Sequence, residues 1–146
     1  MKFFEWDGNR KDLLAYLWIY LTVNYIFCDV FTLHLAKYLE AFLSGDVGGM
    51  KITEEFLLVF AVIMQIPMIM IVLSKFLTFT LNKYFNIVAG IITTSVQAFT
   101  VAMGGATLHY MFYSFFEIFT GLFIIYLAVT WKQETVEDLT LASTVR

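Results

Sequence analysis

Four long apolar segments constrain the fold of this chain more than any other feature of its sequence. They extend over residues 13–43, 56–77, 84–103 and 108–131. A helix needs about 20 mostly apolar residues to cross the hydrocarbon core of a membrane, and each segment reaches that length. Transmembrane strands are about half as long and alternate apolar with polar residues, whereas these runs are unbroken. The sequence therefore predicts four membrane-spanning helices, the first of them unusually long.

The composition excludes a water-soluble domain. Of the 146 residues, 60% are apolar and 14% are charged, whereas an ordinary soluble domain is about 45–50% apolar and about 25% charged. A soluble globule of this size could not bury so much apolar surface. The net charge of −3 offers no basic surface to nucleic acid. The single cysteine, Cys28, excludes an intrachain disulfide and a CxxC motif.

The connections between the segments predict how the helices are arranged. Residues 44–55, 78–83 and 104–107 form short connections, so consecutive helices should pack antiparallel. We therefore expect an all-α integral membrane protein, a four-helix antiparallel bundle over residues 13–132. A cytoplasmic N-terminal segment over 1–12 and a polar cytoplasmic tail over 133–146 would flank this transmembrane domain.

The distribution of lysine and arginine predicts the orientation. Most of them lie at the termini or beside the second connection: Lys2, Arg10, Lys11, Lys75, Lys83 and Lys132. The first connection carries Lys51 beside three acids, and the third carries no charge. Because cytoplasmic loops are enriched in these residues, we expect a multi-pass protein of the cell (inner) membrane with both termini in the cytoplasm. Several aromatic residues fit a belt at the cytoplasmic interface: Trp6, Tyr16, Trp18, Tyr126 and Trp131.

Two acids lie inside the apolar segments, Asp29 and Glu117. Ionisable residues within a membrane are costly, so each is a functional hypothesis. At 1.5 Å per residue, Asp29 lies about 7–8 Å deeper than His34, and Glu117 lies about 12 Å deeper than His109. We therefore expect both acids at similar depth in the outer half of the membrane, facing the bundle interior.

Polar residues follow one face of three of the predicted helices. The first helix carries Tyr25, Asp29 and Thr32, with Asn24 and Cys28 beside them; the third carries Gly90, Thr94, Gln97, Val101 and Gly104; the fourth carries His109, Tyr113, Glu117, Thr120 and Gly121. Spacings of three and four place such residues on one face, and lipid cannot satisfy their polar atoms. We expect a polar interior that opens outward, with six candidate binding residues: Asn24, Asp29, Gln97, His109, Tyr113 and Glu117.

These polar residues can also be interpreted as purely structural. Interhelical hydrogen bonds of asparagine, glutamine and threonine are ordinary in membrane bundles, at about 0.6 kcal/mol on average. Asn24, Gln65, Thr94 and Gln97 fit this structural role.

The sharpest expectation concerns the two acids together. Sequential antiparallel helices close into a ring, which makes the first and fourth helices neighbours, so Glu117 should approach Asp29 or its neighbours on the first helix. Two carboxyl groups close together in a low dielectric cannot both ionise cheaply, so one should hold a proton. The pair is then a candidate proton or cation site. Alternatively, each acid separately accepts hydrogen bonds from Tyr25, Tyr113 or Asn24.

We expect no metal and no cofactor. No HxxxH or ExxH pattern places two ligands on one helical turn, and His34 lies about 140° around the helix from Asp29. A haem held by His34 and His109 is an alternative to this expectation, and it has less support than a metal site. The sequence contains no GxSxG, Walker or Rossmann motif, so a catalytic role is less expected than a binding role.

Several motifs together cover nearly all of residues 13–131: NYIFCDVF at 24–31, GGMKIT at 48–53, FLL at 56–58, IPM at 66–68, NIVAG at 86–90, TLHY at 107–110 and EI at 117–118. They resemble a family of small bacterial and archaeal membrane proteins of unknown function, which is similar in architecture to the DoxX-like four-helix proteins. The resemblance implies four helices in a bacterial-type inner membrane. It implies no activity and no catalytic residue.

Three functional hypotheses follow, and all place the protein in the lipid bilayer. The first is a module that binds or transports a small solute, cation or proton in an outward-facing polar pocket. The alternative is a structural or accessory subunit that dimerises or docks to a larger membrane complex, such as a quinone-linked oxidoreductase. The third is an enzyme acting on a lipid or quinone, with Glu117 and His109 as an acid–base pair. A cavity, a fully packed interior or a lateral opening beside the histidine would distinguish them.

Overall fold

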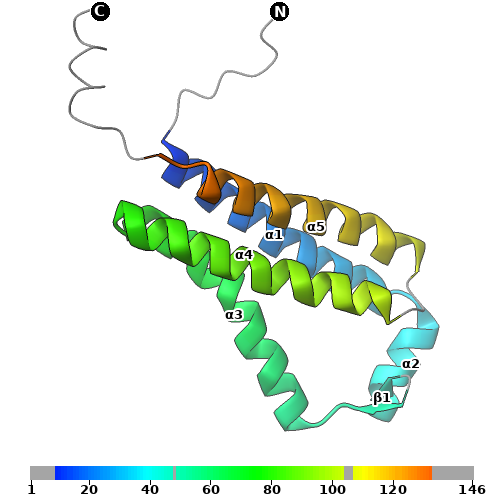
Figure 1. Cartoon of the computed structure of the whole chain (residues 1–146). Coiled ribbons are helices and arrows are strands. Elements are labelled where there is room, and N and C mark those ends of the chain that lie inside the picture. The colour runs from blue at the N-terminus through cyan, green and yellow to red at the C-terminus, as the bar shows by residue number, and fades with distance from the viewer. Residues whose placement is uncertain (1–8, 48, 104–106, 133–146) are drawn as a thin grey trace, which may run out of the picture.

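The computed structural model describes residues 9–47, 49–103 and 107–132, and in these ranges the chain is all-α apart from one small hairpin (Figure 1). The elements in chain order are α1 (Arg10–Leu33), α2 (Ala36–Ser44), β1 (Asp46–Val47), β2 (Met50–Lys51), α3 (Glu54–Phe76), α4 (Phe79–Ala102) and α5 (Leu108–Val129). The strands pair antiparallel, with Asp46 opposite Lys51. Helices α1, α3, α4 and α5 are each long and apolar enough to cross a membrane. The predicted fold class is therefore confirmed.

The four long helices close into a ring. Helix α1 packs against α3 and α5, and α4 packs against α3 and α5, so the first and last spanning helices are neighbours, as their order predicts. The contact between α3 and α4 is the smallest of the four. Figure 1 shows the reason, because the N-terminal half of α3 turns away from α4 toward the hairpin. Pro67 lies between the two halves of α3, and a proline inside a helix removes one backbone hydrogen bond and favours a bend.

The expectation of one continuous first helix as far as residue 43 is wrong. Helix α1 ends at Leu33, Leu35 has an extended backbone, and α2 is a separate helix with no buried residue. The side chain of His34 contacts the carbonyl oxygen of Val30 with its Nδ1 atom at 2.8 Å, which occupies one of the carbonyl groups left free at a helix end. Since 24 residues already span about 36 Å, α1 needs no extension to cross a membrane.

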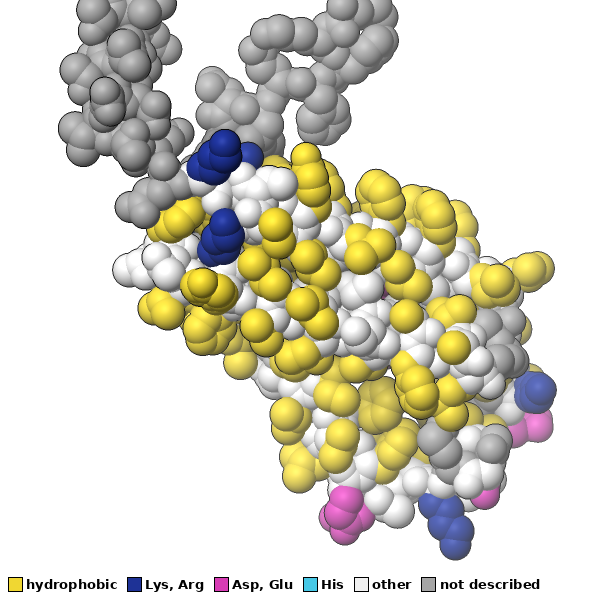
Figure 2. Space-filling view, in the orientation of Figure 1, with side chains coloured by type: hydrophobic (Ala, Val, Ile, Leu, Met, Phe, Trp, Pro, Cys, Tyr) yellow, Lys and Arg dark blue, Asp and Glu magenta, His cyan; other side chains and the backbone are white. Residues whose placement is uncertain are grey.

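Basic side chains cap the C-terminal ends of helices on the side of the molecule where α1 begins. Arg10 Nη1 donates to Leu127 O at 3.2 Å, Lys11 Nζ donates to Leu77 O at 2.6 Å, and Lys83 Nζ donates to Val129 O at 2.9 Å. Cations at helix C-termini satisfy free carbonyl groups and complement the helix dipole. On the face drawn in Figure 2, charged side chains of the described residues gather near the two ends, with apolar side chains between them.

A buried group of polar residues joins three helices in the same half of the bundle. We call Trp18, Ser74, Asn82 and Asn86 the polar core cluster, and none of their side chains is exposed. Trp18 Nε1 and Ser74 Oγ donate to Asn86 Oδ1 at 2.7 and 3.3 Å, and Asn86 Nδ2 donates to Asn82 Oδ1 at 2.6 Å. Asn82 Nδ2 donates to the carbonyl oxygen of Ser74 at 2.6 Å. Each amide therefore has both a donor and an acceptor partner.

The polar core cluster corrects one prediction about the aromatic belt. Trp18 does not lie at an interface, because its ring is fully buried and its N–H group bonds across the bundle to α4. Tyr16 and Tyr126 are exposed, as a belt requires, and Trp131 packs edge-on against Phe79. Trp6 lies outside the described residues, as do residues 1–8 and 133–146 of the two predicted cytoplasmic segments.

Candidate functional site

A cavity of about 590 Å³ lies in the half of the bundle that carries α2 and the hairpin. We call it the hairpin-side cavity. Its apolar wall comes mainly from α3 and the segment before it and consists of Phe42, Val47, Ile52, Phe56, Leu57, Phe60, Ala61 and Met64. Its polar wall comes from α1, α4 and α5 and consists of Tyr25, Cys28, Asp29, Thr32, Gln97, Thr100, Tyr110 and Glu117. The cavity exists because the N-terminal half of α3 diverges from α4 (Figure 1).

Glu117 is the most unusual residue of the polar wall. Its side chain is 1% exposed, and neither carboxyl oxygen has a hydrogen-bond partner among the described residues. A buried polar group is normally hydrogen-bonded, and an unpartnered one needs an explanation such as a role in binding. The alternative in which Glu117 accepts a hydrogen bond from Tyr25, Tyr113 or Asn24 is not what the structure contains.

Asp29 lines the same cavity from α1. Asp29 and Glu117 thus lie in the wall of one cavity, and the helices that carry them, α1 and α5, pack against each other. The side chain of Asp29 is exposed, whereas that of Glu117 is buried. Among the described lining residues, the ionisable ones include two acids and no lysine, arginine or histidine.

Gln97 is the third predicted residue that lines the cavity. Its Nε2 atom donates to Ser114 Oγ at 2.7 Å, so it also joins α4 to α5. This contact fits the structural interpretation of Gln97, while its place in the wall leaves it available to an occupant.

The other three predicted residues lie outside the lining of the cavity. Asn24 Nδ2 donates to the carbonyl oxygen of Tyr20 in its own helix at 2.8 Å. The ring of Tyr113 stacks on Phe31, with 6.0 Å between the ring centroids. His109 contacts the hydroxyl of Thr32 at 3.2 Å and the hydroxyl of Thr107 at 2.9 Å, and so it bridges α5 to α1 above the cavity. Helical spacing places these residues on the face that points into the bundle, but neighbouring side chains separate them from the cavity.

Two tyrosines of the polar wall were not among the six candidate binding residues, although Tyr25 was expected on the polar face of its helix. Tyr110 donates its hydroxyl to Thr100 Oγ1 at 2.7 Å, and the hydroxyl of Tyr25 bonds to Thr93. The sequence does hold a signal for Tyr110, since it precedes Glu117 by two helical turns and therefore shares its face. Glu117 differs from both tyrosines, because its carboxyl oxygens are buried and have no hydrogen-bond partner among the described residues.

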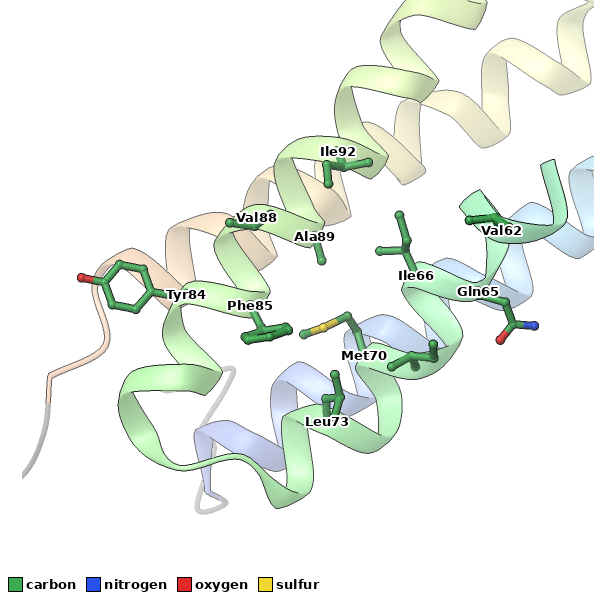
Figure 3. A pocket seen from close by; sticks show the side chains of 11 residues that line it. Val62, Gln65, Ile66, Met70, Leu73, Tyr84, Phe85, Val88, Ala89 and Ile92 are labelled. Carbon is green, nitrogen blue, oxygen red and sulfur yellow. The ribbon is translucent and has the colours of Figure 1, made fainter. Parts of the chain in front are cut away.

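A second hollow lies between α3 and α4, in the half of the bundle that contains the polar core cluster (Figure 3). It has a volume of about 500 Å³ and an almost wholly apolar lining that includes Met70, Phe85 and Ala89. In Figure 3, Gln65 at its edge points away from Met70 and Phe85. Small-molecule sites combine apolar walls with a few convergent polar groups. This groove has no such group, so the hairpin-side cavity is the stronger candidate.

Comparison with known proteins identifies the family. The model of a family described as "Family of unknown function (DUF6326)" matches residues 1–138, which is nearly the whole chain. No curated protein and no solved structure matches the chain. The family match agrees with the resemblance seen in the sequence motifs, and the four apolar helices agree with a membrane location. The chain is therefore a multi-pass membrane protein that belongs to the DUF6326 family.

Proposed function

We propose that this protein binds a small, mainly apolar molecule in the hairpin-side cavity, with the polar end of that molecule at Glu117. One observation carries the proposal: a carboxyl group that is 1% exposed and has no hydrogen-bond partner lines a cavity of about 590 Å³. Cavities of about 300–1,000 Å³ are typical of small-molecule sites. An occupant would supply the partner that Glu117 lacks.

The two walls of the cavity define the chemistry of the occupant. The apolar wall presents Phe56, Phe60 and Met64, which suit a hydrocarbon or aromatic body. The opposite wall presents Asp29 and Glu117, which suit a hydrogen-bond donor or a positive charge. An amphiphile of drug size or smaller meets both walls at once.

The two competing hypotheses have less support. A purely structural subunit requires a fully packed interior, which fits the polar core cluster but not the hairpin-side cavity. An enzyme acting on a lipid or quinone through Glu117 and His109 requires both side chains at one site. His109 instead contacts Thr32 and Thr107 and does not line the cavity.

We propose further that the protein lies in a bacterial-type inner membrane with both termini in the cytoplasm and is a distant relative of the DoxX-like proteins. The basic residues Arg10, Lys11, Lys75 and Lys83 lie at the end of the molecule where α1 begins, which supports this orientation. The cavity then faces the outside.

Binding of 1-adamantanol, a small neutral cage with one hydroxyl group, tests the binding function. The full chain in phosphatidylcholine nanodiscs should bind tritiated 1-adamantanol above the level of empty nanodiscs. Ala61→Trp should weaken binding by at least about tenfold, or about 1.4 kcal/mol, because Ala61 lines the cavity and an indole would fill it.

Val59→Trp is the matched control, since Val59 lies on the same helix, is 57% exposed and does not line the cavity. It should bind the alcohol as the unmodified chain does. Absence of binding to the unmodified chain, or equal binding by both variants, would contradict the proposal.

A further inference from the structure

Glu117 is surrounded by groups that do not stabilise a negative charge. The ionisable residues that line the same cavity are Tyr25, Cys28 and Asp29 from α1 and Tyr110 from the helix of Glu117 itself. The lining residues contributed by α3 and α4 include no ionisable side chain. An ionised carboxylate without a donor or counter-charge is strongly unfavourable in apolar surroundings, whereas the neutral acid is much less so. In the empty cavity, Glu117 therefore holds a proton.

An arriving positive charge changes this balance. A cation in the cavity meets two carboxyl groups, no competing basic side chain among the described lining residues, and the aromatic rings of Tyr25, Phe56 and Phe60. Aromatic faces attract cations, and an ion pair compensates a buried carboxylate that would otherwise be unpaired. Both features favour an occupant whose polar end is an ammonium group over a neutral one.

We propose that the occupant of the hairpin-side cavity is an amphiphilic ammonium cation and that its binding displaces the proton of Glu117. This inference rests on the proposed binding function and adds the charge of the ligand and its exchange with a proton. The ammonium group pairs with the carboxylate as the O–H bond of the neutral acid breaks, and the proton leaves to solvent. One positive charge enters and one leaves, so the net charge of the cavity is unchanged.

The test compares 1-adamantylamine, which is a cation at neutral pH, with the neutral 1-adamantanol of the same shape. Binding of the amine to the full chain in nanodiscs should release about one proton per ligand, measured with a pH indicator in weak buffer. Affinity for the amine should rise about tenfold per pH unit wherever Glu117 still holds its proton, as linkage of one proton requires. The alcohol should release no proton, and its affinity should not depend on pH.

Variants assign the proton to its residue. Glu117→Gln should abolish proton release and weaken amine binding by at least about tenfold, while an unchanged circular-dichroism spectrum shows that the variant is folded. Glu117→Asp keeps the carboxyl group and should keep the release. Glu55→Gln removes an exposed acid that does not line the cavity and should behave like the unmodified chain.

The outcomes separate this inference from the binding function. Equal affinities for amine and alcohol without proton release would overturn the inference and leave the binding function standing. Release that persists in Glu117→Gln and disappears in Asp29→Asn would overturn the assignment to Glu117. If neither compound binds, the proposed function itself is wrong.

Discussion

At the scale of single residues, Asn24 and Asn86 show how position determines what a buried amide contributes. Both lie inside spanning helices and are at most 9% exposed. The amide of Asn24 donates to a carbonyl group of its own helix. The amide of Asn86 accepts from Trp18 on α1 and from Ser74 on α3, and so it joins three helices.

The two asparagines should therefore respond differently to truncation. Asn86→Ala should lower the free energy of unfolding by roughly 1–3 kcal/mol, because the N–H group of Trp18 and the hydroxyl of Ser74 lose their shared acceptor. Asn24→Ala should change it by no more than about 0.6 kcal/mol, the average for a polar side chain in a membrane bundle. Unfolding by sodium dodecyl sulfate in mixed micelles, followed by circular dichroism, measures both. Equal losses would show that the polar core cluster does not hold the helices together.

At the scale of elements, α4 and α5 pack closely against each other at Gly121. A Cβ atom added at Gly121 would overlap the hydroxyl oxygen of Thr94. That hydroxyl is buried and has no hydrogen-bond partner among the described residues. Glycine is therefore required at this position because a side chain would not fit between the two helices, and not because the backbone needs an unusual conformation.

A double-mutant cycle tests this contact. Gly121→Ala should lower the free energy of unfolding by roughly 1–3 kcal/mol through overpacking. Thr94→Ala in the same chain should recover most of this loss, since it removes the overlapping oxygen. Gly90→Ala is the control: its Cβ would lie 2.7 Å from Cγ1 of Ile125, a less severe overlap than that at Gly121, so its effect should be smaller. Additive effects of Gly121→Ala and Thr94→Ala would show that the two residues are not in contact.

The elements also show what the sequence can and cannot predict. The four spanning helices were predictable because length and hydropathy carry that signal directly. The end of α1 was not, since apolar Leu33 and Leu35 flank the break and its local cause is a contact between the side chain of His34 and a backbone oxygen.

The same limit applies to the candidate site. Helical spacing correctly placed Asp29, Gln97 and Glu117 around one cavity. Spacing could not exclude Tyr113 and His109 from the lining of the cavity. It defines the face of a helix on which a residue lies, but not which part of that face a neighbouring helix covers. Tyr113 packs on Phe31 of α1, and His109 contacts Thr32. Both contacts depend on the packing of α5 against α1.

At the scale of the whole molecule, the two halves of the bundle are built differently. The half that begins with Arg10 is closed by the polar core cluster and by basic side chains on the helix ends. The opposite half contains the hairpin-side cavity and the unpartnered Glu117. One half is thus closed by buried polar contacts, whereas the other encloses a cavity.

This polarity across the membrane leads to a test of orientation. In a Cys28→Ala background, Ser44→Cys in α2 and Ser143→Cys in the predicted tail should react with a membrane-impermeant maleimide from opposite sides. In intact cells, Ser44→Cys should be labelled from outside, and Ser143→Cys should react only after the membrane is opened. The expectation follows from the excess of basic residues at the end where α1 begins.

Leu122→Cys, on the lipid-facing side of α5 at 54% exposure, is the control that should stay unlabelled. Labelling of both serine positions from one side would contradict four spanning helices, and labelling of Ser143→Cys alone from outside would place the cavity on the cytoplasmic side.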